Sequence, residues 1–157
     1  MEIKPVVIID TREELPWTIT DFPSVTEGLS IGDYGIKGFS DWNNPRFIVE
    51  RKSLSDLVYS LTRRRKAFYR ELEKMRKFQY AAVLIEANRC DILDHKYRSK
   101  VYPESILQTL NAIMVRQNIH CVFCGDREGA IALFQGLVRQ FCRGVVKEYK
   151  TLLRSTG

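Results

Sequence analysis

The chain has 157 residues, of which 45% are apolar and 28% charged, a composition typical of a globular domain. Its 25 Lys and Arg residues exceed its 19 Asp and Glu residues, so the formal net charge at pH 7 is +6, which permits a polyanionic partner without selecting one. No apolar run approaches the roughly 18 residues that span a membrane, the N-terminus lacks a secretory signal pattern, and four cysteines are too few for a disulfide-stapled secreted protein. We therefore expect a cytoplasmic protein without membrane contact.

The first half of the chain is predicted to be rich in strands. Residues 6–9 form a continuous apolar run, which is typical of a strand buried on both faces. The stretch 11–30 is dense in proline, glycine and hydroxyl residues and is predicted to be a long loop. Further strands are expected over residues 29–38 and 46–51, and the turn-like stretch 41–45 joins them. This part of the chain is therefore predicted to form a meander.

The second half alternates helices with short strands. Ser53 suits a helix N-cap, and apolar residues recur at helical spacing after it. A polar loop is expected over residues 89–100. The other expected elements are helices over 54–61, 65–78 and 103–118, strands over 81–85 and 120–123, and a last helix capped by Asp126, whose basic continuation after Arg143 is either helical or frayed. The layout predicts an α/β fold in a single domain over residues 1–157, with a core over about 4–143.

Three acidic residues stand at the ends of the first three predicted strands. Asp10 closes the first strand, Asp33 lies at the second, and Glu50 closes the third. A rigid sheet can hold carboxylates at such positions close enough to share a cation, and their hard oxygen ligands suit Mg²⁺ or Mn²⁺. The pattern therefore predicts a divalent-metal site.

The sequence Glu50-Arg51-Lys52 refines this prediction. Because side chains alternate across a strand, Glu50 and Lys52 are expected on one face and Arg51 on the other. A carboxylate and an ammonium group then flank one pocket. Such a pair suits phosphodiester hydrolysis, in which a metal held by Asp33 and Glu50 activates a water while Lys52 orients it or stabilises charge on the phosphate oxygens.

These residues carry a resemblance to a known family. Residues 32–33 (GD), sixteen further residues, residues 50–52 (ERK), three more residues and Asp56 together resemble the GD…ERK…D signature of XPF-type structure-specific nucleases. Residues 9–13 (IDTRE) resemble the first-strand motif of the same family. The likeness extends to about Arg143 and so covers nearly the whole chain.

The resemblance implies a fold and a set of site residues. The expected fold is restriction-endonuclease-like, also called PD-(D/E)XK: a three-layer α/β arrangement in which helices flank a central mixed sheet. Asp33 and Glu50 are implied to be metal ligands for Mg²⁺ or Mn²⁺, and Lys52 is implied to be catalytic. The residues implied to complete the site are Asp10 and Glu13, as further metal ligands, together with Arg51 and Asp56.

The resemblance also implies an activity and partners. We expect an endonuclease that hydrolyses branched DNA, such as a flap or a fork, in repair, recombination or replication, and that acts at the nucleoid or in the nucleus. Family nuclease domains dimerise, so a homodimer is expected. Longer members carry a helix-hairpin-helix domain or a helicase, for which a chain ending at Gly157 has no room, so a protein partner is expected to supply DNA targeting. The alternatives are a non-catalytic DNA-binding partner subunit and a Holliday-junction resolvase.

Several basic residues are candidates for DNA contact. Arg63, Arg64, Arg65 and Lys66 form a dense basic stretch after the predicted site, which is either a phosphate-binding surface or a solvated helix face. Arg12, within IDTRE, and Tyr34, a ring beside Asp33, are further candidates for contact with DNA.

The sequence allows two roles for some other residues. Asp56 belongs either to the site or to a capping box with Ser53, and Glu13 is either a metal ligand or a solvated loop charge. Cys121 and Cys124 have zinc-ligand spacing, but residues three apart in a strand face opposite sides, and the sequence has no second pair. We therefore interpret both thiols as structural.

Overall fold

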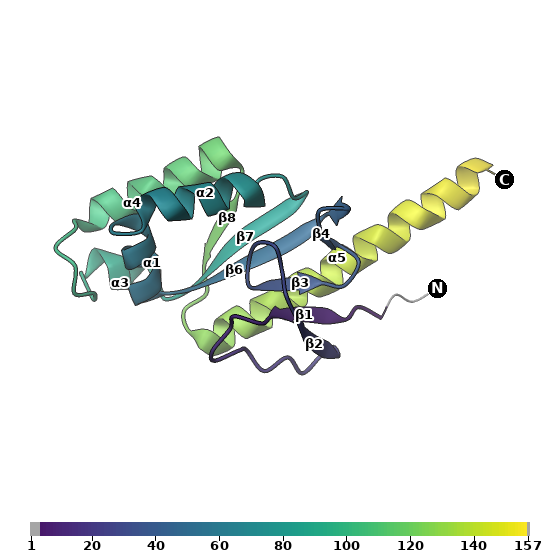
Figure 1. The fold of residues 1–157 in the computed structure, drawn as a ribbon, viewed down its shortest axis with the longest axis horizontal. Helices are drawn as coiled ribbons and strands as arrows, with labels where there is room; N and C mark the ends of the chain where they lie inside the picture. The colour runs from purple at the N-terminus through teal and green to yellow at the C-terminus, as the bar shows by residue number, and fades with distance from the viewer. Residues whose placement is uncertain (1–3, 157) are drawn as a thin grey trace.

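A six-stranded mixed sheet forms the centre of the molecule (Figure 1). The computed structural model describes residues 4–156. The strands of the sheet are β1 (Val7–Asp10), β2 (Ser24–Glu27), β3 (Tyr34–Ile36), β6 (Phe47–Ser53), β7 (Tyr80–Glu86) and β8 (His120–Phe123), in the spatial order β2-β1-β3-β6-β7-β8. Strand β6 pairs antiparallel with β3 and parallel with β7. A separate small hairpin consists of β4 (Ser40–Asp41) and β5 (Asn44–Pro45).

Helices cover both faces of the sheet (Figure 1). One face carries α1 (Leu54–Leu61), α2 (Arg65–Met75), α3 (Arg89–Leu93), α4 (Pro103–Ala112) and the π-helical turn η1 (Ile113–Gln117). The other face packs against α5 (Arg127–Thr156), which projects well beyond the sheet. Two buried apolar clusters follow from this division, one on the α2 face and one on the α5 face. None of the helices described is long and apolar enough to cross a membrane.

The predicted α/β arrangement is confirmed. Two segments that were expected to be loops contain regular structure. Strand β2 lies within the expected loop 11–30 and pairs parallel with β1 at the edge of the sheet. Its residues alternate between exposed and half-buried, and valine is the one apolar residue among them. The strand is therefore held in the sheet by its backbone pairing with β1 and not by a buried apolar face. The short helix α3 lies within the expected loop 89–100. The hydrogen bonds of an Asn88–Asp91 capping box begin it.

The C-terminal part of the chain is more regular than expected. Helix α5 continues without a break past Arg143 to Thr156. Conversely, the helix expected over residues 103–118 is α-helical only to Ala112 and then widens into η1. Cys121 and Cys124 lie on opposite faces of the sheet, as the alternation of the strand predicts.

The register of β1, β3 and β6 brings three acidic residues together. Ile9 pairs with Tyr34, and Tyr34 pairs with Val49. The next residues, Asp10, Asp33 and Glu50, are therefore neighbours on the α2 face, although Glu50 lies within β6 rather than at its end, because β6 continues to Ser53. The backbone N–H of Asp10 donates to the carbonyl of Asp33 (2.9 Å), and that of Asp33 donates to Val49 (2.9 Å).

Gly32 makes this close approach possible. Its φ of +80° lies in the left-handed region, and a Cβ atom at this position would lie 2.5 Å from Ile48 Cγ1. Only glycine fits both conditions without movement of the neighbouring strand. The GD dipeptide thus delivers Asp33 to the edge of β6.

Candidate active site

Asp33, Glu50 and Lys52 form the first of two polar clusters, on the α2 face of β6. The carboxyl groups of Asp33 and Glu50 lie close enough for each to influence the pKa of the other. The Lys52 Nζ atom lies 3.1 Å from Glu50 Oε1 and 5.1 Å from the centre of the Phe68 ring. The backbone N–H of Arg51 donates to Asp33 Oδ2 (2.8 Å), which fixes that carboxylate against β6. Glu50 and Lys52 share one face, as their alternation predicts.

This first cluster holds more negative charge than its single lysine balances. Burial and the neighbouring Glu50 carboxylate raise the pKa of Asp33 to about 8. Burial also raises the pKa of Glu50, while the Lys52 ammonium acts in the opposite direction. Two buried carboxylates that repel one another are a suitable donor pair for a divalent cation, because the cation supplies the missing positive charge.

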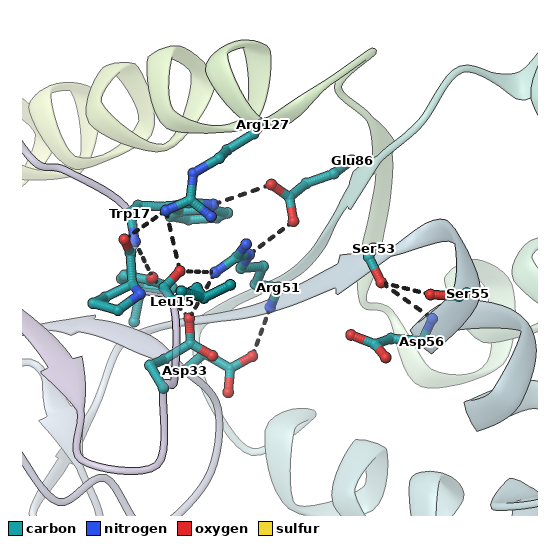
Figure 2. Close-up of polar contacts among 12 residues, drawn as sticks. Leu15, Trp17, Asp33, Arg51, Ser53, Ser55, Asp56, Glu86 and Arg127 are labelled. Atoms are coloured by element: carbon teal, nitrogen blue, oxygen red, sulfur yellow. Dashed lines mark hydrogen bonds and ion pairs between the residues drawn. The ribbon is translucent and has the colours of Figure 1, made fainter.

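The second cluster lies on the α5 face and is centred on Arg51 (Figure 2). The Arg51 guanidinium donates to Glu86 Oε1 (2.7 Å), to Glu13 Oε2 (3.1 Å) and to the carbonyl of Leu15 (2.6 Å). Two carboxylates and one carbonyl thus surround one cation. Arg51 therefore braces its neighbours on the face opposite Glu50, as the strand alternation predicts.

Aromatic packing completes the second cluster. Trp17 stacks on Tyr34 with ring centres 4.2 Å apart, and the Arg51 guanidinium lies 5.6 Å from the Trp17 ring. The backbone N–H of Trp17 donates to the Tyr34 hydroxyl (2.7 Å), which in turn donates to Glu13 Oε2 (2.8 Å). Tyr34 is 0% exposed, so the expected contact of its ring with DNA is not supported: the register places it on the same buried face as Val49.

Glu13 is absorbed by this network. Both of its side-chain contacts, with Arg51 and with Tyr34, lie on the α5 face, opposite the carboxylates of Asp33 and Glu50. The structure therefore shows Glu13 as a partner of Arg51 and Tyr34. Its expected role as a metal ligand has no support in this geometry.

Asp10 lies beside Asp33 but faces other partners. It is 1% exposed, its Oδ2 accepts from Arg12 Nε (2.6 Å), and its Oδ1 accepts from the Leu29 N–H (2.8 Å). Burial raises the pKa of Asp10, but these hydrogen bonds outweigh it and hold the pKa below its usual value. Direct metal ligation by Asp10 would require Arg12 to give up this pairing.

Arg12 itself remains accessible. Its side chain is 67% exposed, its NH2 group donates to the carbonyl of Leu29 (3.1 Å), and the negative charges of Asp33 and Glu50 contribute to raising its pKa. The guanidinium therefore lies at the mouth of the first cluster. That position suits the DNA contact expected from the sequence.

Asp56 lies at the start of α1. The Ser53 hydroxyl accepts from the Asp56 N–H (3.2 Å), so Ser53 is the N-cap (Figure 2). The Asp56 side chain is exposed. Together with Arg12, Glu13, Arg51 and Glu86, both residues line a cavity of about 300 Å³. Asp56 thus lines a cavity beside Arg51 and also belongs to the first turn of a helix, and Asp33, Glu50 and Lys52 are not among the residues that line this cavity.

The four residues of the basic stretch 63–66 diverge in space. Arg64 forms an ion pair with Glu71 (3.2 Å), and Arg65 donates to the carbonyl of Leu61 (3.2 Å) and lies 5.1 Å from the Tyr69 ring. Arg63 and Lys66 are exposed, and Arg63 lines a second groove beside α1. The stretch is therefore not one continuous surface.

Two residues of the second cluster, Glu86 and Arg127, were not predicted from the sequence. Glu86 ends β7 and accepts from Arg51, and the Trp17 indole N–H also points to it (3.4 Å). The rule that selected Asp10, an acidic residue that closes an apolar strand, applies equally to Glu86. Arg127 donates to the carbonyls of Leu15 (3.1 Å) and Pro16 (2.6 Å) from the start of α5, and no sequence signal marks it.

Within residues 4–156, no group of three or more His, Cys, Asp or Glu side chains is arranged to hold a metal ion. Asp33 and Glu50 are a pair, and the third neighbouring carboxylate, Asp10, is turned to Arg12. The groups that fit a cation are thus the carboxylates of Asp33 and Glu50, whose pKa values are raised.

Comparison with known proteins agrees with this geometry. The family model described as the ERCC4 domain matches residues 9–137. Among solved structures, XPF from Aeropyrum pernix is similar, with a TM-score of 0.69 and 21% identity over 87% of this chain and 61% of that chain. The same protein in complex with DNA gives a TM-score of 0.67 and 21% identity over 89% of this chain and 66% of that chain. No similar sequence was found among curated proteins.

The chain thus spans less than two thirds of the length of these two XPF chains. The structural likeness confirms the restriction-endonuclease-like fold that the GD and ERK motifs imply. The family match begins at Ile9, within IDTRE, and includes both polar clusters. Because the matched residues make up well over half of the chain, this protein belongs to the ERCC4 domain family.

Proposed function

We propose that this protein is a Mg²⁺- or Mn²⁺-dependent endonuclease that hydrolyses phosphodiester bonds in branched DNA. The observation that carries the proposal is the buried pair of Asp33 and Glu50, with Lys52 3.1 Å from Glu50, in a chain of the ERCC4 domain family. Two carboxylates and one lysine on one face of a strand are the groups that metal-assisted phosphodiester hydrolysis requires.

Each residue of the first cluster has a role in this proposal. Asp33 and Glu50 hold the cation, which when bound lowers the pKa of a water and neutralises charge on the phosphate. Lys52 orients the attacking water or stabilises the charge that develops on the phosphate oxygens. The Phe68 ring and Glu50 hold its ammonium group in place. Arg51 fixes Asp33 through its backbone N–H.

Two observations support DNA as the substrate, and the net charge of +6 is compatible with it. The first is that the XPF structure from Aeropyrum pernix includes a complex with DNA, and the second is the position of Arg12. Exposed Arg12 stands beside the carboxylates, where it can hold a phosphate next to the bond that is cut. We extend the proposal to flaps and forks, as expected for XPF-type nucleases, and to a role in repair, recombination or replication.

The direct test is cleavage of end-labelled single strands, duplexes, 3′ flaps, 5′ flaps, forks and four-way junctions with Mg²⁺, Mn²⁺ or a chelator. We expect metal-dependent cutting of branched DNA by the wild type and none by Asp33→Asn. Binding without cutting under every metal condition would instead indicate a non-catalytic subunit or a requirement for a protein partner. Paired, symmetric cuts in four-way junctions alone would indicate a resolvase.

We also propose that the protein forms a homodimer through α5. The distal part of this helix carries three exposed apolar residues, Tyr149 (46% exposed), Leu152 (63%) and Leu153 (52%). Such a cluster on a projecting helix favours contact with another apolar surface. Sedimentation equilibrium should give twice the 18.3 kDa chain mass, and Leu152→Glu should give the monomer mass. A monomeric wild type would contradict the proposal.

A further inference from the structure

A second groove, distinct from the site cavity, lies between α1 and the loop that joins α3 to α4. Its volume is about 900 Å³. Four of its lining residues are basic, namely Arg63, Lys96, Arg98 and Lys100, two are tyrosines, Tyr59 and Tyr97, and none is acidic. A groove with four cations and no carboxylate among its lining residues is complementary to a polyanion.

The loop side of the groove is held in a defined shape. His95 Nε2 donates to the carbonyl of Ser99 (2.6 Å), the Tyr97 hydroxyl donates to the carbonyl of Val101 (2.7 Å), and the two rings stack 4.1 Å apart. The exposed cations Arg98 and Lys100 are thus carried on an ordered loop. Ordering before binding reduces the entropy that a ligand must overcome.

Three of the four cations are also available to a ligand. Of the ion pairs within 4.0 Å among residues 4–156, one involves Lys96, which contacts Asp91 (3.6 Å), and none involves Arg63, Arg98 or Lys100. Among the residues that the structure describes, no carboxylate therefore pairs with these three cations, and a phosphate would not have to displace one.

The α1 side adds an aromatic surface. Tyr59 lines the groove and is 50% exposed, an unusual position for so large a ring in a helix that buries Leu57 and Val58 beside it. Exposed aromatic rings beside cations are the combination that binds single-stranded nucleic acids, because unpaired bases stack on the ring while cations hold the backbone. A duplex hides the faces of its bases and cannot use Tyr59 in this way.

The groove begins directly after the strand that carries the proposed cleavage residues. Glu50 and Lys52 belong to β6, which ends at Ser53, and the next two residues, Leu54 and Ser55, line the groove. From Ser55 to Thr62 the groove follows α1 for about 10 Å. A stacked strand carries one phosphate per about 3.4 Å, so this length accommodates about three phosphates.

We propose that this groove binds the single-stranded arm of the branched DNA, with a base stacked on Tyr59 and phosphates held by Arg63, Arg98 and Lys100. The inference rests on the proposed nuclease function and deepens it, since the groove would select a substrate that has an unpaired strand next to the cut. It assigns substrate recognition to the α1 face and to a loop that lies outside the GD and ERK motifs.

The test measures fluorescence anisotropy with a labelled fork that has a 10-nucleotide single-stranded arm and with a blunt duplex, both in EDTA to prevent cutting. The variants are Arg98→Ala/Lys100→Ala, Tyr59→Ala and Tyr59→Phe. The matched control is Lys74→Ala/Lys77→Ala, which removes the same charge from exposed positions at the far end of α2, where Lys77 lies near Trp42. Circular dichroism melts confirm that each variant folds.

We expect Arg98→Ala/Lys100→Ala to weaken binding of the fork by about tenfold or more and of the duplex by less than about threefold. It should also reduce the slope of log K against log salt by about 1.4 for two lost phosphate contacts. Tyr59→Ala should weaken fork binding at least about fivefold, and Tyr59→Phe, which keeps the ring, should bind like the wild type.

Equal weakening by the control pair, or equal weakening of fork and duplex binding by the groove variants, would overturn the groove assignment. A wild type that cuts forks while the groove variants bind them normally would overturn the groove alone and leave the nuclease proposal intact. A wild type that neither binds nor cuts any DNA would overturn both.

Discussion

The two faces of strand β6 treat ionisable side chains in opposite ways. On the α5 face, Arg51 donates hydrogen bonds to Glu13, to Glu86 and to the carbonyl of Leu15, so that both carboxylates accept from one guanidinium. On the α2 face, Asp33 and Glu50 lie beside a single lysine and their pKa values are raised. One strand thus carries a hydrogen-bonded ion network on one side and a pair of carboxylates with raised pKa values on the other.

This difference separates scaffold from chemistry. The network of Arg51 stabilises a loop and a sheet edge, but its hydrogen-bonding groups are already paired with one another and are not available to a ligand. An excess of buried carboxylate costs folding free energy and is relieved when a cation binds. The comparison predicts that substitutions on the α2 face impair the reaction, whereas substitutions on the α5 face impair stability.

The largest expected effect contrasts Glu50→Gln with Glu86→Gln. Glu50→Gln should lower the single-turnover rate of flap cleavage by about 1,000-fold or more, because it removes a carboxylate of the cation-binding pair. Glu86→Gln should leave that rate within about tenfold, since Glu86 contacts Arg51 and Trp17 instead. Similar losses of rate in both variants would break the distinction between the faces.

Arg51→Met tests the other side of the comparison. It leaves Glu13 and Glu86 without their shared cation in a largely buried setting, so the free energy of unfolding should fall by about 2–3 kcal/mol. Urea denaturation followed by circular dichroism measures this. An unchanged midpoint would mean that the network contributes no stability.

The pH dependence of stability sharpens the comparison further. Because the folded-state pKa of Asp33 is raised to about 8 from an ordinary value near 3.8, the metal-free fold gains stability from protonated Asp33 at low pH. That stability is lost as the pH rises toward 8. In EDTA, the melting temperature should fall between pH 5 and pH 8 by about 10 °C.

Asp33→Asn should reduce this fall, because asparagine keeps a neutral group at every pH. Glu50, whose pKa is also raised, retains part of the effect. Differential scanning calorimetry at fixed ionic strength provides the comparison, with Glu86→Gln as the control. Parallel curves of melting temperature against pH for the wild type and Asp33→Asn would show that the loss of stability does not come from Asp33.

The smallest effect is expected for Arg12→Ala. Its side chain is 67% exposed, so its loss should cost less than about 1 kcal/mol of stability. DNA affinity should fall about three- to tenfold through the loss of one phosphate contact, measured by anisotropy at several salt concentrations. Complete loss of cutting would instead place Arg12, or the Asp10 that it holds, in the chemistry itself.

Much of the fold could be predicted because its central strands are apolar runs. Strand β7 and the core of β1 are continuous hydrophobic segments, and the GD and ERK motifs implied a mixed sheet flanked by helices through the family resemblance. The edge strand β2 could not be predicted, since its polar residues are held by backbone pairing with β1. Local pattern carries no information about such pairing.

The site was predictable in its grouping but not in its partners. Asp33, Glu50 and Lys52 meet as expected. Asp10 is drawn away by Arg12 and by the Leu29 N–H, a contact across 19 residues that no local pattern reveals. Tyr34 is buried because its register with Val49 places it under α5, which depends on the pairing of β3 with β6.

The most direct test of the central claim is titration of the metal-free protein with Mn²⁺, followed by electron paramagnetic resonance of the free ion. We expect the wild type and Glu86→Gln to remove Mn²⁺ from solution with the same affinity. Asp33→Asn and Glu50→Gln should each bind at least about tenfold more weakly, because each removes one carboxylate of the pair. Unchanged Mn²⁺ binding by Asp33→Asn and Glu50→Gln would contradict the assignment of the metal site to the α2 face of β6.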